Sequence, residues 1–268
     1  MIYLYILLSV ILFLAMGFLF LVFPSFRRHK DRQKIKGLMI AHRGLHNKDK
    51  GIPENSMEAF ILAAAKGYGI ETDMRLTADG EIVLFHDNTL KRMCDIDKRV
   101  DEFTLAQLQS FGLGGTDHKI PTLKEFLNMV DGRVMLVLEL KCTDKDCEKL
   151  CIKVNEILSN YKGDYCIESF YPGAVKWYRI HRKDIMRGQL AMPYKGKETL
   201  KKIAAKFMAN VLSRPDFSAF DVTEVNNPFF VLQRVLGAYP VGWTIKSAEE
   251  LEKVKKYCDA YIFEGFEP

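Results

Sequence analysis

Strand-like and helix-like stretches alternate along most of this chain, and such alternation is typical of a parallel α/β architecture. Eight short runs rich in aliphatic residues are predicted to be its strands, at residues 38–42, 69–76, 134–141, 165–170, 185–191, 217–223, 239–245 and 259–263. The run at 134–141 is apolar almost without interruption, as expected of a strand buried on both faces of its sheet. A further run, at 81–85, follows an Ala-Asp-Gly turn and is predicted to fold back as a hairpin.

Two acidic residues, Glu71 and Asp73, occupy alternate positions of the predicted strand 69–76. Side chains alternate between the two faces of a strand, so both carboxylates point to the same side. Two carboxylates that close repel by on the order of a few kcal/mol unless they are solvated, protonated or bridged by a cation. A hard divalent ion is the natural bridge for oxygen ligands, and an edge strand with solvated charges is the alternative.

Other predicted strands carry charge only where they end. The run at 134–141 finishes with Glu139 and Lys141 on one face, and the first strand leads directly into His42 and Arg43. The carboxyl ends of parallel strands meet on one side of a barrel or an open sheet, which is where these folds hold their chemistry. The pattern therefore predicts a functional site at that end of the strands.

Seven short motifs follow one another in a characteristic order. They are His42-Arg43-Gly44, Pro53-Glu54-Asn55-Ser56, Glu71 with Asp73, Phe85-His86-Asp87, Glu139-Leu140-Lys141, Ser169-Phe170 and Trp243-Thr244. In residue type and order the chain resembles the glycerophosphodiester phosphodiesterase family over about residues 38–268. The resemblance implies a (β/α)8 TIM barrel with a small insertion at about 88–121 that shades the barrel mouth. It also implies hydrolysis of glycerophosphodiesters to sn-glycerol 3-phosphate and an alcohol, with Mg2+ or Ca2+ as the cofactor.

The resemblance assigns roles to three groups of residues. The metal ligands are matched by Glu71, Asp73 and Glu139, the acid/base histidines by His42 and His86, and the phosphate contacts by Arg43 and Lys141. A cation with Arg and Lys side chains suits the negative charge that grows on a phosphodiester under attack. Two histidines that titrate near neutrality suit proton transfer to and from the reacting oxygens. The sequence leaves open which histidine is the acid, and whether water or a substrate hydroxyl attacks.

Three further residues are expected to contact the substrate. Glu54 matches a family motif near the site, and Phe170 and Trp243 match positions that would pack against the glycerol or alcohol moiety; burial in the core is the alternative for both rings. Asn55 or Ser56 is predicted to cap the helix that follows. The last predicted strand departs from the family, because Glu264 stands where an Asp before a Pro is common.

The N-terminus is predicted to be a membrane anchor. No residue from Ile2 to Phe23 is charged, and at helical rise this stretch covers about 33 Å, enough to cross a hydrocarbon core of roughly 30 Å. A cleavable signal peptide would have a basic first segment and a shorter apolar stretch. We therefore divide the chain into a transmembrane anchor (1–24), a basic juxtamembrane linker (25–36) and a TIM-barrel domain (37–268).

The basic linker bears on topology. Its Arg and Lys side chains follow the apolar stretch directly, and none precedes that stretch, so the positive-inside rule predicts a single-pass protein of the cell membrane with a cytoplasmic catalytic domain. The same cluster is also suited to anionic lipid headgroups. Six cysteines without a CxxC pair fit reduced thiols in a cytosolic domain, although an even count leaves disulfides open if the topology is inverted.

Composition limits the function classes. The net charge of +5 rests mostly on the juxtamembrane cluster, so no nucleic-acid partner is expected; the oligomeric state is not encoded in any motif. The first hypothesis is a membrane-anchored glycerophosphodiesterase with a small-molecule or lysolipid substrate. The alternatives are a lysophospholipase D-like or phosphatidylinositol phospholipase C-like lipid enzyme, and a catalytically silent barrel that binds phosphodiesters.

Overall fold

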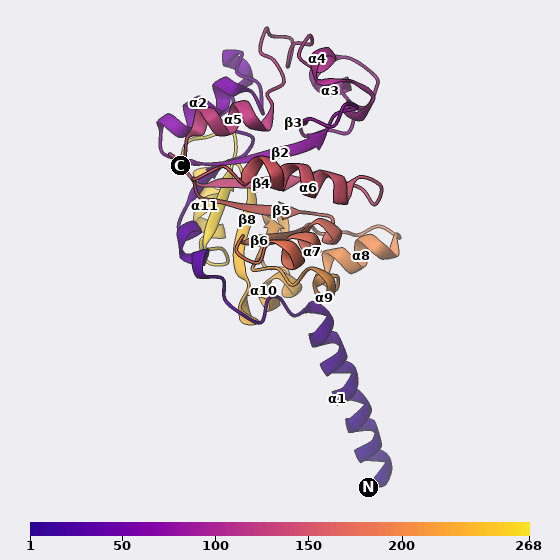
Figure 1. Ribbon diagram of the computed structural model, residues 1–268. Helices are drawn as coiled ribbons and strands as arrows, with labels where there is room; N and C mark the ends of the chain where they lie inside the picture. Colours follow the sequence, from indigo (N-terminus) through magenta and orange to yellow (C-terminus); the bar gives the residue numbers. More distant parts are fainter.

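Eight parallel strands close into a barrel in the computed structural model, which describes residues 1–268 (Figure 1). The order around the barrel is β1-β9-β8-β7-β6-β5-β4-β2, and β2 pairs with β1 to complete the circle. The barrel strands are β1 (Met39–Ala41), β2 (Gly69–Leu76), β4 (Leu136–Leu140), β5 (Tyr165–Ser169), β6 (Arg187–Ala191), β7 (Phe217–Asp221), β8 (Tyr239–Ile245) and β9 (Ala260–Phe263). The eight predicted barrel strands are confirmed, with ends that differ by a few residues.

The ninth strand, β3 (Ile82–Leu84), pairs antiparallel with the far end of β2 and lies outside the barrel. The predicted hairpin is thus confirmed, and it carries the chain to His86 beside the barrel mouth. Residues 88–121 follow with only short helices, which pack with β3 around a small core of their own that includes Leu90, Leu108 and Ile120. Figure 1 shows this segment, with α3 and α4, standing away from the other helices.

Helices cover the outside of the barrel (Figure 1). The α-helices are α1 (Ile2–Val22), α2 (Met57–Ala65), α3 (Lys91–Cys94), α4 (Leu105–Leu108), α5 (Leu123–Val130), α6 (Cys147–Leu158), α7 (Pro172–His181), α8 (Thr199–Ala205), α9 (Asn210–Ser213), α10 (Pro228–Val235) and α11 (Ala248–Val254). The 3-10 helices are η1 (Lys30–Ile35), η2 (Lys48–Lys50), η3 (Val100–Glu102) and η4 (Val222–Glu224). Helix α2 begins where the hydroxyl of Ser56 accepts a hydrogen bond from the Ala59 N–H, so of the two predicted caps it is Ser56 that acts.

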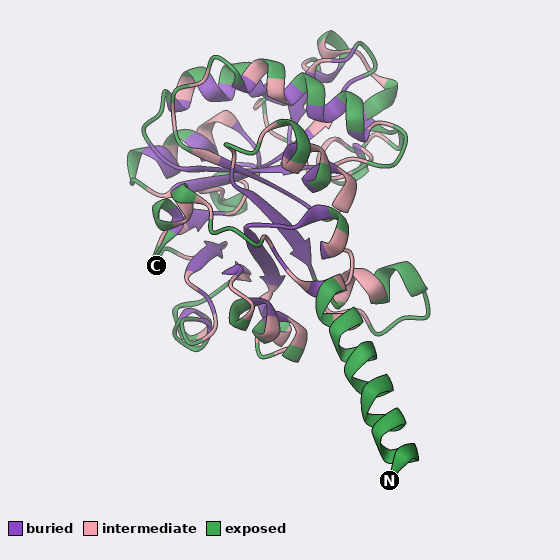
Figure 2. Ribbon diagram, turned by 60° about the horizontal axis from the view of Figure 1, so that its bottom comes forward, coloured by how far each residue is buried: buried purple, intermediate pink, exposed green.

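Two apolar layers hold the barrel together. One lies between the strands and the helices, with side chains such as Ile70, Leu138 and Phe220. The other fills the barrel interior with Val137, Phe217 and their neighbours. Figure 2 shows the barrel strands buried over most of their length. Because side chains alternate along β4, Val137 lies in this interior layer and Glu139, two residues further on, lies one level closer to the carboxyl end.

Helix α1 projects from the barrel beside α9 and α10, and nearly all of its length is exposed (Figures 1 and 2). It is the one helix long and apolar enough to cross a membrane. The helix ends near the amino ends of the barrel strands. Three residues after it, the Ser25 N–H donates to the carbonyl of Pro215, just before β7, at 2.9 Å. All six cysteines are free.

Candidate active site

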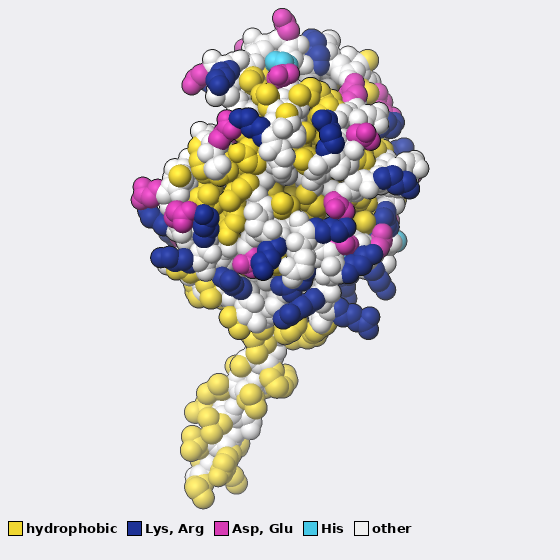
Figure 3. Space-filling view, turned by 90° about the vertical axis from the view of Figure 1, so that its left-hand side faces the viewer, with side chains coloured by type: hydrophobic (Ala, Val, Ile, Leu, Met, Phe, Trp, Pro, Cys, Tyr) yellow, Lys and Arg dark blue, Asp and Glu magenta, His cyan; other side chains and the backbone are white.

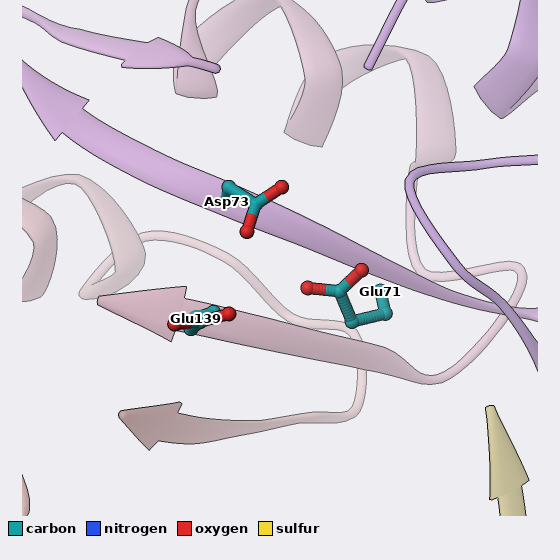
Figure 4. A group of neighbouring side chains, drawn as sticks. All are labelled: Glu71, Asp73 and Glu139. Atoms are coloured by element: carbon teal, nitrogen blue, oxygen red, sulfur yellow. The ribbon is translucent and has the colours of Figure 1, made fainter. Parts of the chain in front are cut away.

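Three carboxylates meet inside the barrel near the carboxyl ends of β2 and β4. Figure 4 shows Glu71 and Asp73 on β2 and Glu139 on the neighbouring β4. The strand register pairs Asp73 with Glu139, so the two lie at the same level. One oxygen of each carboxylate lies within 4.8 Å of one oxygen of the other two, and all three side chains are buried. The predicted metal ligands are therefore brought together as a compact set.

The electrostatics of these carboxylates differ from one to the next. Burial raises the pKa of Glu71 well above its ordinary value, and the charge of Asp73 raises it further. Burial also raises the pKa of Glu139 to about 7, although Lys141 opposes the shift. For Asp73 burial acts in the same direction, but Lys141 and Arg43 outweigh it and hold the pKa well below its usual range. Three ionised carboxylates this close are therefore costly without a further positive charge, and a bound cation would lower the pKa of Glu71 and Glu139.

This donor set fits a hard divalent cation. Oxygen ligands of Mg2+ or Ca2+ lie about 2.0–2.6 Å from the ion, so ligand oxygens on opposite sides are separated by about 4–5 Å. The carboxylate oxygens, all within 4.8 Å of one another, are compatible with that separation. Asp73 Oδ1 is buried 3.1 Å from Lys141 Nζ but accepts no well-aligned hydrogen bond, so it has a lone pair free for an ion.

Two cationic side chains stand beside the carboxylates. Lys141 Nζ lies 2.7 Å from Glu139 Oε2, and Glu139 and Asp73 raise the pKa of Lys141 to about 12 against the opposing effect of burial. Arg43 Nε lies 3.4 Å from Asp73 Oδ2, and the Arg43 backbone N–H donates to Glu71 Oε2 at 3.1 Å. Arg43 has φ +56° in the turn after β1. The next residue must be glycine, because at Gly44 (φ +80°) a Cβ would lie 2.8 Å from the Ala59 carbonyl carbon.

The two histidines that the sequence singles out both face the same cavity. His42 Nδ1 lies 2.5 Å from Glu264 Oε2, and its Nε2 lies 3.8 Å from Glu71 Oε2. His86 Nδ1 lies 2.6 Å from Asp87 Oδ1. In each ring a carboxylate holds Nδ1, which leaves Nε2 for other partners. The hydrogen bond from His42 lowers the pKa of Glu264 to about 2, and burial lowers the pKa of His86 although Asp73 opposes it.

The cavity between these groups has a volume of about 360 Å³. Beside the charged residues it is lined by Phe170 and Trp243, whose ring centroids lie 5.5 Å apart in an edge-to-face arrangement. Phe170 is exposed and Trp243 is half-buried, although Trp243 also packs in part against the interior core, so neither ring is fully buried there. A wider hollow of about 940 Å³ between α5 and α6 is lined by surface Lys, Glu and Asn side chains and holds no buried carboxylate cluster. We therefore place the candidate site at the smaller cavity.

Glu54 lies behind Arg43 and not on the cavity wall. Its Oε1 accepts from Arg43 at 2.8 Å, and both of its oxygens accept from Arg92, which belongs to the segment 88–121. The two arginines lower the pKa of Glu54 although burial opposes them. Glu54 thus links the insertion to Arg43, the side chain that the sequence predicts to contact phosphate.

Three further residues contribute to the site. Glu168 is assigned no role by the sequence pattern, Glu264 is expected only as a departure from the family in the last strand, and Asn55 only as part of a motif near the site or a helix cap. Glu168 on β5 is level with Glu139, is buried, and has an oxygen without a hydrogen-bond partner. Glu264 holds His42, and Asn55 donates to Asp73 Oδ2 at 2.9 Å while accepting from Thr72. A signal for Glu168 was available, because it follows Cys166 on one face of a predicted strand just as Glu139 follows Val137.

Taken together, an eight-stranded parallel barrel with acids, histidines and cations at the carboxyl ends of its strands defines a TIM-barrel protein of the enzyme type. The model of the glycerophosphoryl diester phosphodiesterase family matches residues 42–261. The chain therefore belongs to that family, and the family resemblance seen in the sequence is confirmed.

Curated relatives match part of the chain. A glycerophosphodiester phosphodiesterase of Caldanaerobacter subterraneus subsp. tengcongensis is 37% identical over 115 residues, which are 40% of this chain and 46% of the relative. A lysophospholipase D of Rattus norvegicus is 26% identical over 166 residues, which are 57% of this chain and 51% of the relative. The chain thus spans about half the length of the curated relatives it matches.

Solved structures share the fold over nearly the whole chain. An Oleispira antarctica phosphodiesterase in complex with the product sn-glycerol-3-phosphate has a TM-score of 0.70 at 22% identity, covering 87% of this chain and 94% of that one. A glycerophosphodiester phosphodiesterase of Thermotoga maritima has a TM-score of 0.66 at 24% identity, covering 84% and 94%. At this identity the likeness establishes the barrel fold.

Proposed function

We propose that this protein is a membrane-anchored, divalent-metal-dependent phosphodiesterase that hydrolyses glycerophosphodiesters to sn-glycerol 3-phosphate and an alcohol. The observation that carries the proposal is the convergence of three carboxylates, two histidines and two cationic side chains on one cavity of the barrel. Family membership and the product bound to the Oleispira antarctica phosphodiesterase support the substrate class.

Glu71, Asp73 and Glu139 would hold a Mg2+ or Ca2+ ion, which when bound polarises a phosphoryl oxygen and offsets charge in the transition state. Arg43, with its planar fork, and Lys141, as a point charge, would orient the phosphodiester in the cavity. Both cations already lie against the carboxylates, so a phosphate near the metal would lie within reach of all these groups.

His42 and His86 would carry the protons. One histidine takes a proton from the attacking hydroxyl, of water or of the substrate glycerol, and the other gives a proton to the leaving alkoxide. The carboxylates of Glu264 and Asp87 fix the two rings through Nδ1, so proton exchange would occur at Nε2. Phe170 and Trp243 would pack against the glycerol or alcohol moiety on the remaining side of the cavity.

A lysophospholipid is the second candidate substrate. The rat relative that carries the name lysophospholipase D supports it, and so does an anchor that would keep the barrel at a lipid surface. Mass spectrometry of the products separates the candidates. Glycerophosphocholine should give glycerol 3-phosphate and choline, whereas a lysophospholipase D-like enzyme would release lysophosphatidic acid from lysophosphatidylcholine. A phospholipase C-like enzyme would leave a cyclic phosphate, and a silent binding barrel would release nothing.

The proposal includes the N-terminal helix as a membrane anchor. We divide the chain into a transmembrane anchor (1–24), a linker (25–36) and a catalytic domain (37–268). The buried side chains of Asn210 and Gln233 both donate to the Val22 carbonyl at 3.0 Å. Cleavage of a signal peptide would remove that acceptor and leave two buried amides without it, at a cost of about 1–3 kcal/mol for each. These contacts favour a retained helix, and the basic linker favours a cytoplasmic catalytic domain.

A further inference from the structure

A second charged pocket lies at the opposite end of the barrel from the candidate active site. It is an open pocket of about 610 Å³, lined by residues 25–30, by α7 and the turn that follows it, by the start of β6 and by the segment between α9 and β7. Seven of its lining residues are Arg or Lys, and two are carboxylates. Strand β6 connects the two regions, since it begins at this pocket with Arg187 and reaches the active-site cavity at Leu190.

The inner wall of this pocket is made by arginines that outnumber their acidic partners. Arg187 is 7% exposed; its Nη1 lies 3.2 Å from Asp216, and its buried Nε has no hydrogen-bond partner. Arg214 is 5% exposed and donates to main-chain carbonyls at the end of α1 and not to a carboxylate. Arg179 lies close enough to both for its charge to lower the pKa of each, adding to the effect of burial.

The second carboxylate does not correct this imbalance. Asp184 is paired with Arg182, which lies outside the pocket, at 2.8 Å. Asp216 is therefore the one carboxylate left on the inner wall, and it pairs with Arg187 at 3.2 Å. Arg179 and Arg214 donate to main-chain carbonyls instead, and the outer rim adds further cations, among them Arg28 and Lys183. Buried charge of one sign is costly without a counter-charge, so the pocket is suited to an anion. Guanidinium forks match the oxygens of a phosphate in particular.

The position of the pocket indicates the source of that phosphate. Helix α1 is clamped to the barrel at its last turn, because Arg214 Nη1 donates to the Phe20 and Phe23 carbonyls at 2.9 and 2.6 Å. The pocket begins at Ser25, three residues after the helix ends. If α1 spans the bilayer, these residues lie at the level of the lipid headgroups. Figure 3 shows Lys and Arg side chains gathered on the part of the barrel next to the apolar anchor.

We propose that this pocket binds the phosphate of an anionic phospholipid in the leaflet where α1 ends, with Arg179, Arg187 and Arg28 as its contacts. The proposal rests on the anchor proposed above. Together, the bound headgroup and the clamped helix hold the barrel in one orientation on the membrane, and the active-site cavity at the other end of β6 stays free for substrate.

The test is thermal unfolding of the full-length protein in dodecyl maltoside with added phosphatidylglycerol or phosphatidylcholine at equal mole fraction. A ligand that binds the folded state raises Tm, and for a chain of this size saturating phosphatidylglycerol should raise it by about 5 °C. Phosphatidylcholine, which has no net charge, should give a much smaller shift. An equal shift with both lipids would overturn the proposal, and so would an equal shift with inorganic phosphate alone, which would identify a free-phosphate site.

Variants locate the effect. Arg179→Gln removes an inner guanidinium that has no ion pair, and the exposed pair Arg28→Gln with Lys183→Gln removes rim charge without disturbing the fold. Both should abolish most of the phosphatidylglycerol shift and leave hydrolysis of glycerophosphocholine unchanged. The matched control, Lys98→Gln with Lys119→Gln in the insertion, loses the same charge far from α1 and should keep the shift. A shift that persists in both pocket variants overturns the site.

Carbonate extraction of membranes distinguishes this proposal from the anchor on which it rests. Retention of the full-length chain in the membrane pellet, together with loss of the lipid shift in the variants, supports both. Retention without a lipid-specific shift would overturn the headgroup site alone. Release into the supernatant would overturn the anchor and with it the headgroup site.

Discussion

The carboxyl ends of the barrel strands bury four carboxylates beside two cationic side chains, whereas the amino ends bury two arginines beside one carboxylate. The carboxylates are Glu71, Asp73, Glu139 and Glu168, and the arginines are Arg187 and Arg214. One end fits a divalent cation followed by a phosphate, and the other fits a phosphate directly. Both ends lie on the same eight strands, so the barrel contributes rigidity while the side chains at each end determine the ligand.

Buried charge in this barrel is either balanced within the protein or left unbalanced at the surface of a cavity. A buried carboxylate beside one cation, such as Asp216 beside Arg187, is neutralised by that partner and needs no ligand. A buried set with surplus charge of one sign is not stabilised in this way, because desolvation opposes it and no partner offsets the cost. The surplus at each end therefore indicates a ligand of opposite sign.

Loss of the metal should have the largest effect. Removal of divalent ions by EDTA, or Glu71→Gln, should lower kcat/KM for glycerophosphocholine about 1000-fold, because several kcal/mol of charge stabilisation is lost. Isothermal titration with Mg2+ and Ca2+ should show weakened binding to Glu71→Gln. Glu81→Gln, a partly exposed carboxylate at the neighbouring hairpin that pairs with Lys124, is the control and should behave as the unmodified protein. Normal activity in EDTA would show that hydrolysis does not depend on a divalent ion.

Removal of either histidine should have the next largest effect. His42→Ala and His86→Ala should each lower turnover about 100-fold or more, as expected for a lost proton-transfer group, while metal binding is retained. His181→Ala, an exposed histidine on α7, serves as the control. Turnover within a few-fold of normal in either active-site variant would exclude that histidine from catalysis.

Glu264 should have a smaller effect, because it acts through His42. Glu264→Gln should lower kcat about 10-fold by releasing the ring, and Glu264→Asp should restore part of the loss. The pH dependence of Tm tests the same contact between Glu264 and His42. The folded-state pKa of Glu264 is about 2 against an ordinary 4.5, so its pairing stabilises the fold above pH 4.5 and is lost as pH falls toward 2. Without metal, Tm of Glu264→Gln should therefore fall less steeply over that range than Tm of the unmodified protein.

The clamp on α1 should affect stability and not catalysis. Asn210→Ala with Gln233→Ala should lower Tm of the full-length protein by several degrees, because two buried hydrogen bonds to Val22 are lost. Hydrolysis of glycerophosphocholine should stay normal, since the clamp lies near the amino ends of the strands. Asn160→Ala, at an exposed position, is the control. An unchanged Tm in the double variant would mean that α1 is not held by these side chains.

Much of the barrel could be predicted from the sequence because its signals are local. Aliphatic runs identify each strand, and the period of two places Glu71 and Asp73 on one face of their strand and Glu139 with Lys141 on one face of theirs before any contact is known. The hairpin that carries His86 follows from one short turn. These features depend on neighbouring residues, so a single sequence contains them.

Contacts between distant segments could not be predicted in this way. Glu264 reaches His42 across 222 positions, and Asn210 reaches Val22 across 188. The arginine pocket has the same character, since its three inner guanidinium groups come from α7, β6 and the end of α9, and nothing local marks any of them as a ligand contact. For Glu54, a local motif predicted a position near the site, but its ion pair with Arg92, 38 residues further along the chain, could not be predicted.

The most direct test of the central claim is release of sn-glycerol 3-phosphate from glycerophosphocholine by the full-length protein in detergent, followed by a coupled assay. We predict release with Mg2+ or Ca2+, none in EDTA, and recovery when the ion is returned. Release that continues in EDTA, or no release with either ion from protein that is folded by circular dichroism, would contradict the account.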